Sequence, residues 1–280
     1  MISELTTRDW LQFTAIAAAI STCGALLGII LKDSVFSRSF ERWKQRQSLE
    51  ALYDKYRDPL FLSARELASR LAEIVQDYPT VFLKSDVLAS RPEQQLHNST
   101  DDPYFQRYKL VSSAYRFCAF LGWLELYRQE GTYLHSGSNE HSKKLEAAVS
   151  LVRSDLADGH LNEADDWLDW RDTLIFREEL RAIGESMIEV RGTTRTVMGY
   201  CKYVELFDSN EASSTGRWSK VILNFLLELE TKQRDFRRVR LKLLVVHLVG
   251  LMELLDARSI EKRLIELRDE LVAADPLKQA

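Results

Sequence analysis

Glycine and proline are scarce in this chain, which contains 11 Gly and 5 Pro among 280 residues. Proteins built from many short strands need frequent turns, and Gly and Pro supply many of them. Their scarcity argues against a turn-rich all-β protein. Long runs rich in Leu, Ala, Glu, Arg and Lys instead predict an all-α fold, and an apolar content of 45% is enough for a sizeable core.

Cysteine is also scarce. The three cysteines, Cys23, Cys118 and Cys201, are far apart and form no C-x-x-C motif. This spacing excludes a disulfide framework and a cysteine-based zinc site, and it suits a reducing cytoplasm.

The motifs of the common catalytic families are missing. There is no G-x-x-x-x-G-K-[ST], no G-x-G-x-x-G after a strand, no H-E-x-x-H and no G-x-S-x-G. We therefore expect no cofactor and no metal, and we favour a protein that is not an enzyme, although a novel enzyme remains open. The net charge of −4 makes nucleic acid an unexpected partner.

A long uncharged run occurs only once, from Leu11 to Leu31. At about 1.5 Å per residue, a helix of this length reaches across a hydrocarbon core of about 30 Å. We predict a single transmembrane helix within an anchor of residues 1–33, with a short extracytoplasmic N-terminus and the lipid bilayer as its partner. Two other apolar runs, 110–127 and 243–255, are too short or too charged to span.

The charges on either side of this run predict its orientation. One basic residue, Arg8, precedes it, whereas five follow it within about 15 residues. The five are Lys32, Arg38, Arg42, Lys44 and Arg46. The positive-inside rule then places residues 34–280, a helical domain, in the cytoplasm.

Small residues form a seam along the predicted span. Ala17, Ser21, Gly24 and Gly28 are spaced four, three and four apart, so they share one helix face. Small residues let two backbones approach closely in lipid, which would favour a homo-oligomer. The alternative is that Gly and Ala are simply common in membrane helices.

The remaining residues predict a soluble multi-helix bundle. On residues 37–75 the apolar positions Leu60, Ala64, Leu67 and Leu71 form a stripe, and the charged residues are expected mostly on the other side, namely Arg65, Glu66, Arg70 and Glu73. Residues 77–103 read as an irregular excursion with one short helix near 81–89. Further helices are expected over 110–127, 142–158, 162–170, 173–190, 196–207, 217–255 with a break near 233–238, and 259–274.

Several segments resemble a group of uncharacterised bacterial proteins that have an N-terminal apolar segment and an all-helical body. The resemblance implies a bacterial source, hence an inner-membrane location, and a membrane-tethered helical domain; it implies no activity. The stretches that carry it are YRDPL (56–60) with AREL (64–67), LGWLELYR (121–128), FREELRAIGESM (176–187), GRW (216–218) and LLD (254–256).

The most suggestive polar cluster lies in FREELRAIGESM. Arg177, Arg181 and Glu185 are four residues apart and share a helix face, so they are candidates for binding an anionic ligand. The alternative is ordinary pairing of charges on a solvated face, worth about 0.2–0.5 kcal/mol per pair.

Three weaker clusters have alternative explanations. Asp165, Asp166 and Asp169 would suit a divalent cation, but acidic residues also complement the start of a helix. His247 among apolar neighbours predicts a core histidine with satisfied ring nitrogens. The basic run 232–242 would suit an anionic partner, but balance by acidic residues elsewhere is the commoner arrangement.

The sequence therefore favours a membrane-anchored helical protein that binds an unknown protein partner or responds to a signal. The alternative is a membrane-tethered enzyme or nucleotide-responsive effector that uses Arg177, Arg181 and Glu185.

Overall fold

The computed structural model of the chain describes residues 7–30, 37–88, 102–131, 140–158, 173–209, 213–229 and 235–274. These residues are mostly helical, so the all-α prediction is confirmed at this level. By their internal contacts the residues divide into two units, 1–51 and 52–280. The predicted boundary between residues 33 and 34 lies outside the described residues.

The first unit contains helix α1 (Thr7–Ile30) and the first part of helix α2 (Ser37–Val75). Large apolar side chains on α1 are exposed, including Trp10, Phe13 and Ile20. A Cβ atom at Gly24 would meet nothing within 4 Å. Three residues of the predicted seam, Ala17, Ser21 and Gly24, are exposed. The exposure of the fourth, Gly28, lies outside what the structure describes.

Residues 26–31, which complete the uncharged run, lie outside the described side chains. Within the residues that are described, no helix combines enough length with enough apolar character to cross a membrane.

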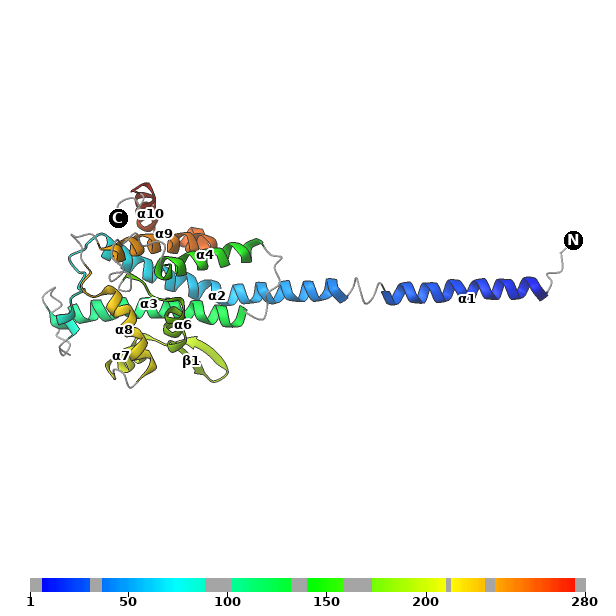
Figure 1. The fold of residues 1–280 in the computed structure, drawn as a ribbon, viewed down its shortest axis with the longest axis horizontal. Coiled ribbons are helices and arrows are strands. Elements are labelled where there is room, and N and C mark those ends of the chain that lie inside the picture. The colour runs from blue at the N-terminus through cyan, green and yellow to red at the C-terminus, as the bar shows by residue number, and fades with distance from the viewer. Residues whose placement is uncertain are drawn as a thin grey trace. The chain divides into compact units, whose positions relative to one another are not determined.

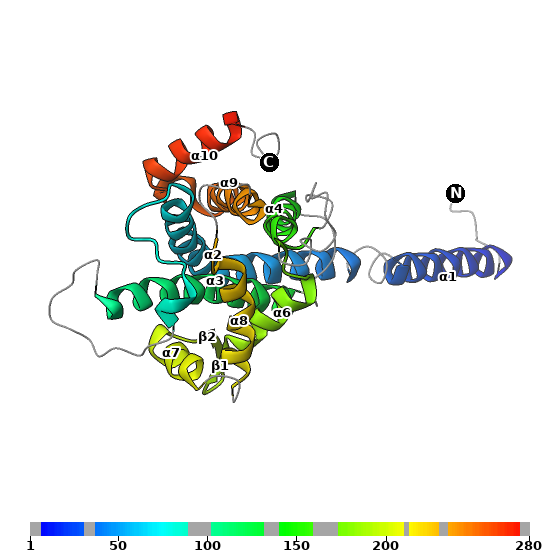
Figure 2. The ribbon, with the colours of Figure 1, turned by 60° about the vertical axis from the view of Figure 1, so that its left-hand side comes forward.

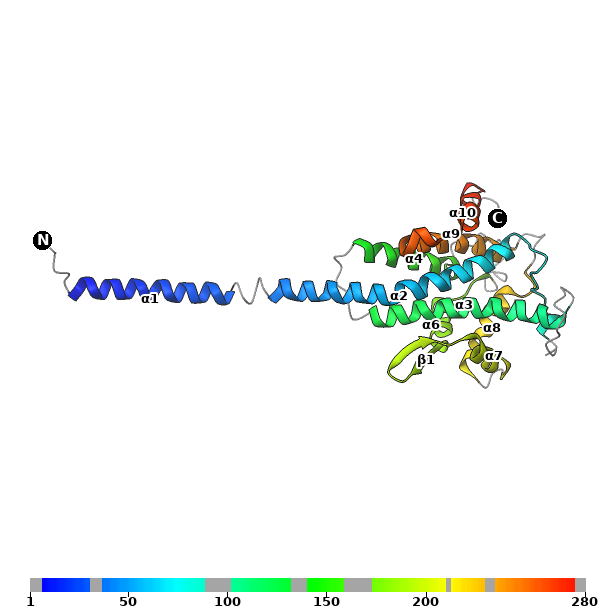
Figure 3. The ribbon, with the colours of Figure 1, turned by 180° about the vertical axis from the view of Figure 1, so that it is seen from behind.

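The second unit has two long helices at its centre. The part of α2 from Leu52 onward runs beside α3 (Pro103–Gly131), with three helices on one side and three helices plus a hairpin on the other (Figures 1, 2 and 3). On the first side lie α4 (Glu140–Ala157), α9 (Phe236–Asp256) and α10 (Lys262–Ala274). On the other lie α6 (Arg177–Ser186), α7 (Tyr200–Asp208), α8 (Ser214–Leu226) and the strands β1 (Ile188–Arg191) and β2 (Thr194–Val197).

Helix α2 continues through Pro59, and its predicted apolar stripe is confirmed. Leu60, Ala64, Leu67 and Leu71 are each at most 1% exposed. The expectation for Arg70 is wrong. Arg70 is buried because the polar side of α2 packs against α3.

A short ion-pair network makes the burial of Arg70 tolerable. Arg70 Nη1 lies 2.7 Å from Glu73 Oε2, and Lys109 Nζ of α3 lies 2.8 Å from the same oxygen. A buried charge needs such partners, because its desolvation is otherwise expensive.

Helix α3 (Pro103–Gly131) is longer than predicted and begins at a proline that we had assigned to an irregular excursion. Pro suits the first helical position, where its missing N–H would have no partner in any case. The carboxylate of Asp102 caps this end by accepting from the backbone N–H of Tyr104 at 3.0 Å. In the described part of the excursion, the short helix predicted over 81–89 is reduced to a 3-10 turn, η2 (Ser85–Leu88).

The helix predicted over 173–190 is wrong at both ends. Helix α6 begins at Arg177, and after Met187 the chain forms an antiparallel hairpin in which Ile188 pairs with Val197 and Arg191 with Thr194. Alternating β-branched residues favour strands. Gly192, at φ +62°, supplies the positive φ that a two-residue hairpin turn requires. The following helix, α7, therefore starts at Tyr200 rather than at residue 196.

The long helix predicted over 217–255 breaks earlier than expected. Helix α8 ends at Leu226, and the chain turns through Glu228 at φ +51°. The backbone N–H of Glu228 donates to the carbonyl of Leu83 at 2.7 Å, so the turn is held against the segment before η2. A break was predicted near 233–238, and the next helix, α9, does begin within that range, at Phe236.

Candidate functional site

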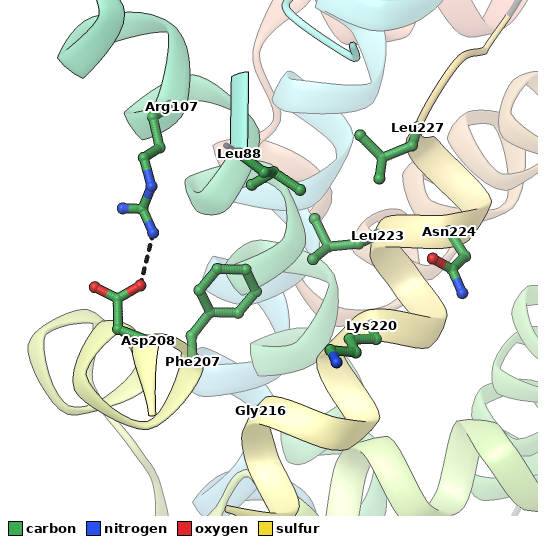
Figure 4. A pocket seen from close by; sticks show the side chains of 9 residues that line it. All are labelled: Leu88, Arg107, Phe207, Asp208, Gly216, Lys220, Leu223, Asn224 and Leu227. Atoms are coloured by element: carbon green, nitrogen blue, oxygen red, sulfur yellow. Dashed lines mark hydrogen bonds and ion pairs between the residues drawn. The ribbon is translucent and has the colours of Figure 1, made fainter. Parts of the chain in front are cut away.

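A pocket of about 420 Å³ lies where η2, α3, α7 and α8 meet (Figure 4). Its walls combine apolar and polar side chains in about equal measure, and Figure 4 shows Leu88, Phe207 and Leu223 around its centre. Polar groups lie at its edges. The full lining is Leu88, Arg107, Phe207, Asp208, Gly216, Lys220, Leu223, Asn224 and Leu227.

Local interactions hold the four elements of this pocket in place. The side chain of Ser213 caps α8 by accepting from the backbone N–H of Gly216 at 2.8 Å. At the other end of α8, the Glu228 carboxylate accepts from the backbone N–H and the hydroxyl of Ser85, at 2.8 and 2.7 Å. These bonds lower the pKa of Glu228 and place η2, with Leu88, beside α8.

An ion pair joins two walls of the pocket. Arg107 Nη2 of α3 lies 2.6 Å from Asp208 Oδ1 at the end of α7. The two side chains are only 15% and 26% exposed. Nε of Arg107 is buried and has no hydrogen-bond partner among the described residues, so this lining residue keeps an unused donor.

The residues of this pocket carry no signal in the sequence. Arg107, Asp208 and Lys220 come from three helices and are separated by up to 113 positions. No motif links residues at such a distance. Only the packing of α7 and α8 against α3 brings them together.

The sequence candidates lie elsewhere. Arg177, Arg181 and Glu185 occupy the exposed side of α6, and none of them lines the pocket. Arg177 Nη2 is 2.7 Å from Asp158 Oδ1 of α4, and its side chain is 49% exposed. Although the three share a face as predicted, ion pairs among the three do not form.

His247 is half-buried, with its side chain 28% exposed, rather than the core residue predicted, but its Nδ1 has a partner of the kind expected. Its Nδ1 lies 2.7 and 2.9 Å from the two oxygens of Asp155, a carboxylate that is 3% exposed. Burial raises the pKa of Asp155, and His247 and Arg240 oppose that rise. Through its contact with Asp155, His247 of α9 joins α4.

The basic run is mostly occupied by internal contacts. Arg237 pairs with Asp235 at 2.7 Å and donates to the carbonyl of Leu227 at 2.9 Å. Arg238 pairs with Asp77 at 2.9 Å. Lys232 and Arg234 lie outside the described residues. In the part that is seen, these charges stabilise the fold.

No group of three His, Cys, Asp or Glu residues that would hold a metal ion occurs in the described parts of the chain. The acidic cluster of Asp165, Asp166 and Asp169 lies outside them.

Comparisons with protein-family models, with curated proteins and with solved structures give no match to this chain. The resemblance to membrane-tethered bacterial proteins therefore stays a prediction.

Proposed function

We propose that the chain is a single-pass membrane protein whose helical body binds a small ligand in the pocket and responds to it as a signal. The observation that carries this proposal is the pocket itself, which takes residues from η2, α3, α7 and α8. A ligand there would contact four elements at once. Binding would therefore stabilise their relative arrangement, which is how a ligand shifts a population of states.

The lining indicates the chemistry of the ligand. Leu88, Phe207 and Leu223 would cover an apolar or aromatic body, while Arg107 and Lys220 would meet an anionic group. Of the side chains that act as nucleophiles or proton carriers, the lining contains only Asp208, which is paired with Arg107, and Lys220, with no Ser, Thr, Cys or His beside them. It therefore supports binding more than catalysis.

The membrane part of the proposal rests on the sequence of residues 11–31. Twenty-one consecutive residues carry no charge, and the basic residues gather on the C-terminal side. In a bacterial host this arrangement would place the protein in the inner membrane, with the body in the cytoplasm.

We expect the anchor to fail when a charge is placed at its centre. Arg in place of Ala19 costs about 2.5–3.5 kcal/mol at the middle of a membrane helix. In carbonate-washed bacterial membranes, the wild type and Ala19→Leu should remain in the pellet, whereas much of Ala19→Arg should be released. A wild-type chain that washes off would overturn the anchor, and a C-terminal reporter active only outside the cytoplasm would overturn its orientation.

Pocket binding is testable by blocking the mouth of the pocket. Asn224 lines the pocket yet is exposed, so Asn224→Trp should obstruct it without disturbing the core. The probes are nucleoside monophosphates, aromatic carboxylates and fatty acids, screened for their effect on thermal unfolding of the full chain in lipid nanodiscs. A probe present at 100 times its Kd should stabilise the wild type by about 2.7 kcal/mol, a rise of several degrees in Tm.

The matched control is Arg217→Trp, another exposed position on α8 that lies outside the pocket. It should keep the response that Asn224→Trp loses. If no probe stabilises the wild type, or if both variants respond equally, the pocket is not the ligand site.

A further inference from the structure

Four arginines from α3, α4 and α6 lie close enough to act electrostatically on one another. They are Arg128 of α3, Arg153 of α4, and Arg177 and Arg181 of α6. None of them lines the pocket proposed above. We call these four residues the arginine cluster.

The crossing of α3 and α6 brings Arg128 and Arg181 together. The two helices run antiparallel, since Gly122 lies against Met187 while Glu125 lies against Gly184. One turn further along this register, Arg128 on α3 corresponds to Arg181 on α6, and both residues act electrostatically on Arg153 of α4.

Helix α4 adds the other half of the cluster. Arg177 Nη2 donates to Asp158 Oδ1 at 2.7 Å and to Ser154 Oγ at 3.4 Å. The guanidinium of Arg177 therefore lies on α4 at Ser154 and Asp158, and it acts electrostatically on Arg153. The backbone bond from Ile175 N–H to the carbonyl of Leu156, at 2.9 Å, holds the start of α6 at this end of α4.

Two of the four positive charges have a carboxylate partner and two do not. Glu125 is 2% exposed and accepts from Arg128 at 2.8 and 2.5 Å and from Gln129 at 2.7 Å. Arg177 has Asp158. Within the described residues, Arg153 and Arg181 make no ion pair and no hydrogen bond.

The environment of Arg153 is unfavourable for a charge. Burial lowers the pKa of Arg153, and Arg181, Arg128 and Arg177 lower it further, against the opposing effect of Glu125. An arginine remains protonated even so. A half-buried cation among three other cations is the kind of arrangement that a bound anion relieves.

We propose that the arginine cluster binds a phosphate group. Two positive charges lack a partner, and a phosphate monoester carries between one and two negative charges at neutral pH, whereas a carboxylate carries one. The planar guanidinium fork also matches phosphate oxygens in a bidentate manner. The phosphate would come either from a soluble compound or from the headgroup of an anionic lipid.

The negative charge of Glu185 opposes the binding of an anion at the arginine cluster. Glu185 is exposed, lies one turn after Arg181 on α6, and acts electrostatically on Arg128. Removing its charge should strengthen phosphate binding, whereas removing an arginine should weaken it. These opposite signs distinguish a binding site from a merely structural cluster.

The experiment uses the full chain in nanodiscs of phosphatidylcholine, with inorganic phosphate as the soluble probe, measured by calorimetry. A second arm measures binding of the same chain to phosphatidic acid added to the nanodiscs. We expect Arg153→Gln and Arg181→Gln to weaken binding by about tenfold or more, as for a lost charge-assisted hydrogen bond. Glu185→Gln should tighten it, and added salt should weaken it throughout.

The matched control is Arg263→Gln, which removes an exposed arginine of α10 distant in sequence from the cluster. Binding of inorganic phosphate that follows these signs supports a soluble source, and a response confined to phosphatidic acid supports a lipid source. The proposal is overturned if the chain binds neither inorganic phosphate nor phosphatidic acid. It is also overturned if Arg263→Gln weakens binding as much as Arg181→Gln does. Because Arg181 is exposed, Arg181→Gln should fold even if Arg153→Gln does not.

Discussion

Alanine in place of Gly184 is expected to destabilise the helical body, although alanine is the better helix former. The Cβ atom would lie 2.6 Å from the carbonyl oxygen of Leu121 and 2.8 Å from Cβ of Glu125. A backbone oxygen cannot yield as a side-chain tip can, so α3 and α6 must separate. We expect this to outweigh the gain in helix propensity of about 1 kcal/mol and to leave a net loss of about 1–3 kcal/mol.

Two other glycines supply the controls. At Gly250 of α9 a Cβ would meet nothing within 4 Å, so Gly250→Ala should stabilise the protein by up to about 1 kcal/mol. At Gly122 the nearest atoms are Cβ of Met187 at 3.0 Å and the methyl groups of Val197 at 3.1 and 3.3 Å, so an intermediate result is expected. Urea unfolding followed by tryptophan fluorescence gives the ranking. A loss at Gly250 equal to that at Gly184 would contradict the close crossing.

The helix crossing also gives physical meaning to two sequence stretches that have no catalytic signature. LGWLELYR lies on α3 and FREELRAIGESM forms α6, and the two pack against each other at Gly122 and Gly184. The crossing in turn places Glu125, Arg128 and Arg181 near one another. What the two stretches share is thus a packing site that carries charges on its edge.

The sequence predicted helices well where the chain has long apolar stretches. The stripe of α2 follows directly from the helix period, and α3 is apolar on almost all sides because it contacts α6, α7, α8 and β2. The hairpin at 188–197 was predicted wrongly because IEVRGTTRTV follows helix-forming residues without a proline. Its β-branched alternation around Gly192 is a hairpin signal that local helix propensity concealed.

The buried charges and the pocket could not be predicted in the same way. Charged residues such as Arg70 and Arg240 read as surface residues, yet they are 4% and 0% exposed. Whether a charge is buried depends on partners contributed by distant helices, and the helix period does not reveal them. The same holds for the pocket, because Arg107 and Asp208 meet only in the folded body.

The largest single loss is expected from Arg240→Met. Arg240 is fully buried, and its Nη1 and Nη2 donate to the carbonyls of Asp155 at 2.8 Å and Asp158 at 3.0 Å, at the end of α4. Burial lowers the pKa of Arg240 to about 10, while the nearby Asp155 and Asp158 favour its charge. Methionine fills a similar volume but leaves two carbonyls without this donor and a buried carboxylate without this cation. We expect a loss of about 3–5 kcal/mol in the free energy of unfolding.

The pH dependence of this loss separates the missing charge from missing packing. Burial raises the pKa of Asp155 and Arg240 opposes the rise, so in Arg240→Met the pKa of Asp155 should be higher still. The buried carboxyl then becomes neutral at a higher pH than in the wild type, and the variant recovers part of its loss as the pH falls below neutral. Adding Asp155→Asn should likewise reduce the cost of Arg240→Met by about 0.5–3 kcal/mol. A loss that is independent of pH and strictly additive with Asp155→Asn would mean that Arg240 acts only through its bulk and its bonds to the carbonyls.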